Sequence, residues 1–302
     1  MLEAVDTQRL GRSDIEVGRI AYGCWRLAGP DAAEPTAVAE ARTKIETAVD
    51  CGMTLIDTAD IYGRGGPGFG TAEELLGRVL ASSPALRDRM VIATKGGIAP
   101  GVPYDSSPAY LRSACEASLR RLGVEVIDLY QVHRPDLLTH PAEVAAVLTE
   151  LRASGKVREL GISNFSASQQ AALLAHLGDV PLTTIQPELS LLRRDPIDDG
   201  VLDGAMAGGL TPLVWSPLAG GRIAAGELPD ALAAELDALA ERESVTRAAI
   251  ALAWVMAHPS GAIPIIGTQR PERILEAAAA AAVRLSRTEW YTLLAAAGRH
   301  LP

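Results

Sequence analysis

The sequence has few aromatic residues, few cysteines and no apolar stretch long enough to cross a bilayer. Aromatic residues make up only 4% of the 302 positions, so the core must be built mainly from Ala, Leu, Val and Ile. The three cysteines, Cys24, Cys51 and Cys115, form no C-x-x-C pair, which excludes a zinc ribbon and a disulfide framework, and no other metal motif is present. Because the chain shows no signal peptide, these cysteines predict a reducing, cytoplasmic location.

Positive charge is also scarce. The net charge is −9, whereas nucleic acids and anionic membranes require a basic protein surface, so we predict no nucleic-acid and no membrane partner. Any anionic ligand must therefore be held by a local cluster of basic residues. Only three of the 28 Lys and Arg residues are lysines, and one of them, Lys95, follows directly after an apolar stretch.

Short apolar stretches alternate with segments of helical periodicity along the whole chain. The apolar stretches end at residues 24, 57, 95, 133, 163, 186, 215 and 267. Such alternation is typical of parallel strands covered by helices. Eight strand–helix units in a chain of this length predict an α/β protein with one domain, residues 1–302, folded as a (β/α)8 TIM barrel. Residues 7–20 precede these units and predict an N-terminal β-hairpin.

Helix starts are marked by two local signals. Capping boxes, with Ser or Thr followed three residues later by Glu or Gln, are predicted at Thr71–Glu74, Ser166–Gln169 and Ser286–Glu289. Proline fits the first helical position at Pro108 and Pro141. The last strand spacing is long enough for two helices, which we place near 229–242 and 245–258.

The residues that directly follow the apolar stretches are largely polar or ionisable. They include Cys24–Trp25, Asp57–Tyr62, Lys95, His133, Ser163–Asn164, Gln186, Trp215–Ser216 and Gly267–Thr268. Taken singly, each has an ordinary explanation as a cap, a packing residue or an exposed loop residue. Because a barrel brings the C-terminal ends of its strands to one mouth, we predict that these residues line a single pocket.

Four of these residues, Asp57, Tyr62, Lys95 and His133, together suit acid catalysis by a phenol. A free tyrosine has a pKa of about 10 and is a poor acid near neutral pH. An adjacent ammonium stabilises the phenolate, and the carboxylate of Asp57 would hold Lys95 charged. His133 would orient a carbonyl oxygen toward Tyr62. A carbonyl oxygen needs a proton when its carbon receives a hydride or another nucleophile. Because no amino-acid residue can supply a hydride, the arrangement implies a cofactor.

Two glycine-containing regions bear on that cofactor. Residues 63–68 match G-x-G-x-x-G, but Pro67 lies inside the match, so we interpret it as a flexible loop at the pocket rim. The second region combines residues 216–222 with residues 266–273. Its glycines, a helix start near Pro271 and three arginines predict a phosphate cradle, although an ordinary solvated helix start is the alternative. The arginines are Arg222, Arg270 and Arg273.

The ordered motifs closely resemble those of the aldo-keto reductases. They are RLGRSDIEVGRIAYGCW, LIDTADIYG, VIATKGG, DLYQVHRPD, GISNF, IQPELS, WSPLAGG and IIGTQRPERI. The later motifs are most similar to a bacterial oxidoreductase branch that has Trp in WSPL. The resemblance implies NADPH-dependent, reversible reduction of aldehydes or ketones to alcohols. It also implies a small-molecule carbonyl substrate and a monomer or weak homo-oligomer.

The resemblance also implies the roles of individual residues. The catalytic tetrad would be Asp57, Tyr62, Lys95 and His133, with Tyr62 as the proton donor. Contacts to the nicotinamide amide would come from Ser163, Asn164 and Gln186, and Trp215 stands where most members stack a tyrosine. The pyrophosphate loop matches Ser216, Leu218, Gly220, Gly221 and Arg222. The adenosine and its 2′-phosphate would meet Thr268, Arg270, Arg273 and Glu276. Further cofactor contacts are expected from Cys24, Trp25, Pro217, Ile266 and Gly267.

The chain departs from the family pattern at two cofactor positions. Many members have a lysine at Gly267 and an asparagine at Ala277, so Arg270 and Arg273 are expected to carry the preference for NADPH, with NADH as the less favoured cofactor. Two other functions remain as alternatives. One is a Schiff-base aldolase with Lys95 as nucleophile, and the other is a regulatory subunit that binds the nucleotide but turns over slowly.

Overall fold

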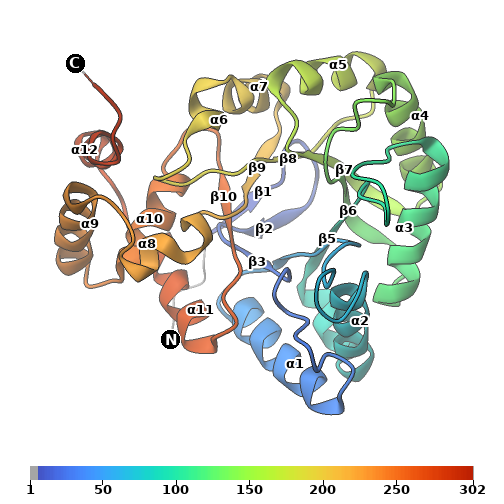
Figure 1. The fold of residues 1–302 in the computed structure, drawn as a ribbon, viewed down its shortest axis with the longest axis horizontal. Coiled ribbons are helices and arrows are strands. Elements are labelled where there is room, and N and C mark those ends of the chain that lie inside the picture. Colours follow the sequence, from blue (N-terminus) through green and yellow to red (C-terminus); the bar gives the residue numbers. More distant parts are fainter. Residues whose placement is uncertain (1–5, 302) are drawn as a thin grey trace.

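The computed structural model describes residues 6–301. It shows a closed barrel of eight parallel strands surrounded by helices (Figure 1). The barrel strands are β3 (Ala21–Gly23), β4 (Leu55–Asp57), β5 (Val91–Gly96), β6 (Ile127–Val132), β7 (Val157–Ser163), β8 (Thr184–Gln186), β9 (Thr211–Val214) and β10 (Ile263–Ile266). The barrel closes because β10 pairs with both β9 and β3. The predicted (β/α)8 fold is therefore confirmed, while positions 1–5 and 302 of the predicted domain lie outside the described residues.

Helices follow the strands and form the outer layer. They are α1 (Pro35–Asp50), α2 (Thr71–Ser82), α3 (Pro108–Leu122), α4 (Pro141–Ala153), α5 (Ala167–Leu177), α6 (Asp195–Asp198), α7 (Val201–Gly208), α8 (Arg222–Ala225), α9 (Asp230–Glu243), α10 (Arg247–Met256), α11 (Pro271–Ala278) and α12 (Arg287–Ala296). The helices α9 and α10 match the two predicted near 229–242 and 245–258. Within residues 6–301, none of the helices has the length and apolar character needed to span a membrane.

Most of the predicted helix starts are confirmed. Both Ser166 and Ser286 form complete capping boxes, and proline occupies the first turn of α3 and α4. The prediction at Thr71 is wrong, because Thr71 is the first residue of α2 and its hydroxyl donates to the carbonyl of Gly68. The cap position is Gly70, whose φ of +87° is left-handed and favours glycine.

The predicted N-terminal hairpin consists of β1 (Thr7–Arg9) and β2 (Glu16–Gly18). Its apolar side chains, including Leu10 and Val17, belong to the same buried cluster as the residues that fill the barrel interior. Gly11 lies against the segments that enter β8 and β9, where a Cβ would come within 2.5 Å of the Thr183 carbonyl oxygen. The hairpin therefore covers the N-terminal end of the barrel, and the C-terminal end remains for a functional site.

Candidate active site

A cavity of about 960 Å³ opens at the C-terminal ends of the barrel strands. Most of the predicted site residues line it. They are Trp25, Asp57, Tyr62, His133, Ser163, Asn164, Gln186, Trp215, Ser216, Pro217, Leu218, Gly220, Gly221, Ile266, Gly267, Thr268, Arg270, Arg273 and Glu276. These residues are spread over 252 positions of the chain (25–276), and closure of the barrel brings them to one mouth.

Three predicted residues lie elsewhere. Lys95 is fully buried beneath the cavity wall, where its side chain reaches Asp57 and Tyr62. Cys24 is also fully buried and packs in the core between the barrel and the helices, although its neighbours Gly23 and Trp25 line the cavity. Arg222 is exposed at the start of α8 and is absent from the cavity wall. Neither Cys24 nor Arg222 thus has a place at the cavity surface.

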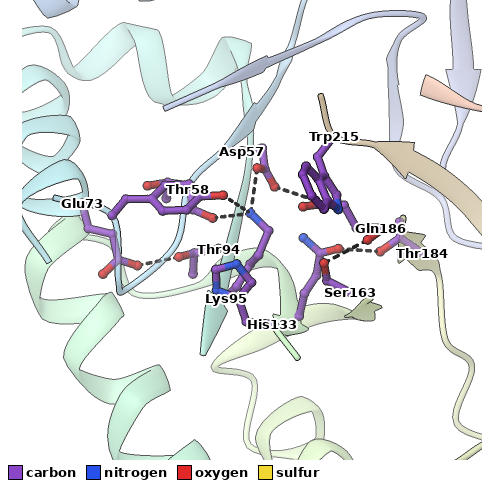
Figure 2. Close-up of polar contacts among 12 residues, drawn as sticks. Asp57, Thr58, Glu73, Thr94, Lys95, His133, Ser163, Thr184, Gln186 and Trp215 are labelled. Atoms are coloured by element: carbon purple, nitrogen blue, oxygen red, sulfur yellow. Dashed lines mark hydrogen bonds and ion pairs between the residues drawn. The ribbon is translucent and has the colours of Figure 1, made fainter. Parts of the chain in front are cut away.

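The ammonium of Lys95 is the centre of the polar network (Figure 2). It donates to Asp57 Oδ2 at 2.7 Å, to the Thr58 carbonyl oxygen at 2.9 Å and to Tyr62 Oη at 3.2 Å. An ammonium has three N–H donors, so each has a partner. The burial of this charge is compensated by a carboxylate and by complete hydrogen bonding. Lys95 is the second-last residue of β5, which pairs with β4, so a carboxylate from β4 can reach its amine.

Burial and neighbouring charges shift the pKa values of Lys95 and Tyr62 in opposite directions. Burial alone lowers the pKa of Lys95, but Asp57 and Tyr62 outweigh it and the pKa of the ammonium is raised. For Tyr62, burial raises the pKa of the phenol, and the opposing effect of Lys95 limits this rise without reversing it. The expected stabilisation of the phenolate by Lys95 is therefore present, while burial keeps the net pKa of Tyr62 above its ordinary value.

His133 lies beside Tyr62, with their rings edge to face and 5.9 Å between the centroids. Burial, together with the positive charges of Lys95 and Arg134, holds the pKa of His133 well below its usual range. The imidazole is therefore neutral near pH 7. Within residues 6–301, the buried Nδ1 atom of His133 has no hydrogen-bond partner. A neutral imidazole can donate one hydrogen bond to a carbonyl oxygen in front of Tyr62.

A second chain of hydrogen bonds extends from Asp57 to the other side of the cavity. Gln186 Nε2 donates to Asp57 Oδ1 at 2.9 Å, and the Gln186 carbonyl oxygen accepts from Ser163 Oγ at 3.0 Å. Asn164 Nδ2 donates to Ser163 Oγ at 2.8 Å and to the His133 carbonyl oxygen at 3.2 Å. Asn164 has a left-handed φ of 61°, an uncommon conformation for a residue other than glycine. The Asp57–Lys95 pair is thereby held from both sides of the cavity.

The wall near β9 and β10 contains glycines, whose backbone a phosphate-bearing cofactor can approach closely. Glycines at 220, 221 and 267 line the cavity, and a Cβ placed on any of them would meet no atom within 4 Å. Gly220 and Gly221 have φ values of +72° and +103°, which side chains rarely adopt. This wall therefore lets a pyrophosphate approach the backbone closely, and the residues present fit a dinucleotide.

The arginines near this wall differ in their surroundings. Arg270 is paired with Glu272, whereas no acidic partner of Arg273 occurs in the described part of the chain. Thr268 accepts a hydrogen bond from the backbone N–H of Arg270, which shapes the turn that enters α11. Arg273, in the first turn of that helix, is the basic side chain of this segment that is free to meet an anion.

Sequence reasoning missed several residues of the cavity wall. The basic ones are Arg26, Arg64, Arg134 and Arg247. A signal existed for Arg134, because it directly follows the strand-end residue His133. Arg64 lies within the glycine-rich loop, whose predicted place at the rim is confirmed. The start of α10, Thr246–Ala248, carried no such signal because it comes from a helix rather than from a strand end.

Comparisons with known proteins agree with this architecture. The model of the aldo/keto reductase family matches residues 19–297. The chain belongs to the aldo/keto reductase family. It is therefore an oxidoreductase that acts on carbonyl compounds with a nicotinamide cofactor.

Two relatives and one solved structure show how far the similarity extends. The chain is 53% identical to 6-dehydroglucose reductase of Novosphingobium aromaticivorans, over 98% of this chain and 97% of that protein. It is 38% identical to 6-dehydroglucose reductase of Agrobacterium fabrum, with 95% and 96% covered. A glycerol dehydrogenase from Gluconobacter oxydans has a similar structure, with a TM-score of 0.85, 32% identity and coverage of 98% and 96%.

Proposed function

We propose that this protein is a single-domain, NADPH-dependent reductase of sugar aldehydes in which Tyr62 is the general acid. The observation that carries the proposal is the ammonium of Lys95, which binds Asp57 and Tyr62 at the base of the cavity. The substrate class comes from the two relatives named 6-dehydroglucose reductase. That sugar is glucose with its C6 alcohol oxidised to an aldehyde, and its reduction restores the alcohol.

The cofactor, when bound, supplies a hydride to the carbonyl carbon. The chain's own task is to hold the carbonyl oxygen and to give it a proton. Tyr62 donates the proton from Oη, and the ammonium of Lys95 at 3.2 Å stabilises the phenolate that remains. Asp57 keeps that ammonium charged and in place. Neutral His133, at the edge of the Tyr62 ring, orients the carbonyl oxygen by a hydrogen bond.

The preference for NADPH rests on the adenosine end of the cavity. Thr268 and Arg273 lie there together, and Arg273 has a guanidinium that is not committed to an acidic neighbour in the described chain. A 2′-phosphate offers the oxyanion that such a group binds in a bidentate manner. A ribose 2′-hydroxyl, as in NADH, offers a single neutral oxygen. NADPH is therefore the favoured cofactor, in agreement with the expectation from the motifs.

The Schiff-base alternative is less well supported. A lysine nucleophile must be neutral, whereas the pKa of Lys95 is raised and its three N–H groups are donated to Asp57, Thr58 and Tyr62. The regulatory-subunit alternative has no positive observation in its favour, since the four residues of the tetrad are brought together.

Steady-state rates with 6-dehydroglucose and with propanal, each with NADPH and with NADH, test the proposal. We expect turnover of both aldehydes with NADPH, a higher kcat/KM for the sugar, and a lower kcat/KM with NADH. If neither aldehyde were turned over, the catalytic proposal would be rejected. Turnover of propanal without turnover of the sugar would reject the substrate class alone.

A further inference from the structure

Arg134 is a half-buried arginine in the cavity wall. It lies directly after His133 at the end of β6, and its guanidinium carbon is 5.9 Å from the centre of the Trp215 ring. Its positive charge acts on His133, whose pKa it helps to lower. Among residues 6–301, no hydrogen bond or ion pair engages the guanidinium of Arg134 with another residue.

Two other arginines of the same cavity are committed to neighbouring carboxylates, whereas Arg26, Arg64 and Arg273 have no ion pair among the described residues. Arg247 forms a two-pronged pair with Asp237, and Arg270 is paired with Glu272. A guanidinium carries five N–H donors and no acceptor, and the guanidinium of Arg134 lines the open cavity. The stacking contact with Trp215 holds the Arg134 side chain but satisfies none of these donors. A ligand with acceptor oxygens would satisfy them.

The position of Arg134 in the barrel indicates which ligand this is. The strand order is β10-β3-β4-β5-β6-β7-β8-β9, so β6 lies across the barrel from β10. The segments that fit the pyrophosphate and adenosine follow β9 and β10. Arg134 instead lies beside His133, which faces the phenol of Tyr62. Its ligand is therefore part of the substrate, close to the reacting carbonyl, rather than part of the cofactor.

We propose that Arg134 determines substrate specificity by binding the hydroxyl oxygens of a polyhydroxylated aldehyde near its carbonyl carbon. This inference rests on the proposed function, since the sugar of the two named relatives is a neutral polyol. Parallel N–H groups of a guanidinium match two neighbouring hydroxyl oxygens, and the charge strengthens each hydrogen bond. Simple aldehydes without hydroxyl groups would use the same Tyr62 and His133 but leave Arg134 unpaired.

The test compares Arg134→Gln, Arg134→Lys and the control Arg42→Gln, an exposed change on α1 that is not part of the cavity wall. Each is assayed with propanal, D-glyceraldehyde and D-glyceraldehyde 3-phosphate in the presence of NADPH. For Arg134→Gln we expect kcat/KM for D-glyceraldehyde to fall about 10- to 100-fold, mainly through KM, with propanal changed less than about twofold. Arg134→Lys should recover little of the lost kcat/KM, because lysine keeps the positive charge but lacks the paired N–H donors of a guanidinium. Arg42→Gln should match the unmodified protein.

Two kinetic outcomes would overturn the inference. Equal losses for propanal and D-glyceraldehyde would show that Arg134 acts through His133 or the fold, because both substrates share the same chemistry. A preference of the unmodified protein for the phosphorylated aldehyde, lost in Arg134→Gln and restored in Arg134→Lys, would identify an anion as the ligand. Thermal unfolding and NADPH binding of each variant show whether it is folded. Failure of the unmodified protein to reduce any of the three aldehydes would instead reject the proposed function, and this inference with it.

Discussion

The indole N–H of Trp215 donates a hydrogen bond to Oδ1 of Asn164 across 3.0 Å. Asn164 in turn donates to the His133 carbonyl oxygen, so the two residues connect the cavity wall after β9 with the histidine beside Tyr62. A tyrosine or phenylalanine at position 215 would offer a flat ring but no N–H at this place. Trp215 is therefore expected to orient Asn164 as well as to stack on the cofactor.

This relationship predicts the effect of Trp215→Phe. The variant keeps an aromatic face but leaves Asn164 Oδ1 without its donor, so we expect kcat for aldehyde reduction to fall about 3- to 10-fold, the equivalent of one neutral hydrogen bond. A double-mutant cycle with Asn164→Ala, measured by kcat and by NADPH titration, isolates the pair. Additive losses would mean that the hydrogen bond has no role in turnover.

Removal of the phenol hydroxyl tests the acid. Tyr62→Phe keeps the ring contact with His133 and loses the group that Lys95 binds. We expect kcat for aldehyde reduction to fall about 10²- to 10⁴-fold, the usual contribution of a general acid, while NADPH binds with little change. Fluorescence titration with NADPH measures the binding of NADPH, since Trp25 and Trp215 line the cavity. A variant that kept most of its activity would contradict the assignment.

The buried Lys95–Asp57 pair predicts a strong coupling in stability. Lys95→Met leaves Asp57 buried with one remaining side-chain donor, Gln186, and we expect it to lower the free energy of unfolding by about 3 to 5 kcal/mol. The double change Lys95→Met with Asp57→Asn removes both charges and should be less destabilised than Lys95→Met alone. Denaturant unfolding of the three variants measures this. A double variant less stable than Lys95→Met would argue against the coupling.

The cofactor preference predicts a difference between two neighbouring arginines. Arg273→Ala should weaken NADPH binding at least about tenfold and NADH binding much less, because a charge-assisted pair with the 2′-phosphate is lost. Arg270→Ala serves as the matched control, since its guanidinium is already held by Glu272, and a smaller change is expected. Titration of each variant with both cofactors gives the comparison. Equal losses for NADPH and NADH in Arg273→Ala would place the 2′-phosphate elsewhere.

The pKa directions predict the dependence of the two reaction directions on pH. Burial keeps the pKa of Tyr62 above its ordinary value of about 10 and the pKa of His133 below about 6.5. The phenol stays protonated and the imidazole neutral between about pH 7 and 9, so kcat/KM for aldehyde reduction should be nearly constant there. Alcohol oxidation requires the phenolate and should rise with pH across the same range. Profiles of both directions check this, and a reduction rate that fell tenfold in that window would contradict it.

Much of the fold and of the tetrad could be predicted because the relevant signals are local. Apolar stretches ending in Asp57, Lys95 or His133 mark strand ends, and any parallel barrel brings such ends together. The cap at Gly70 could not be predicted in the same way. Its left-handed conformation depends on where the preceding loop packs, and a Cβ there would lie 2.6 Å from Arg121 Cδ. The cytoplasmic location and the state of a monomer or weak homo-oligomer stay predictions.

The order of residues by itself determined the barrel, the hairpin and the pairing of a phenol with a lysine, because burial forces charged groups to strand ends and to each other. Only the tertiary structure decided which side chains face the cavity. It placed Cys24 in the core and Trp25 at the wall, in the turn that follows the end of β3. It also decided that, within residues 6–301, Arg134 has no ion pair with a carboxylate while Arg247 and Arg270 do. Whether an arginine finds a carboxylate partner depends on how helices and loops that are distant in sequence pack together. Sequence pattern and motif spacing do not predict this packing.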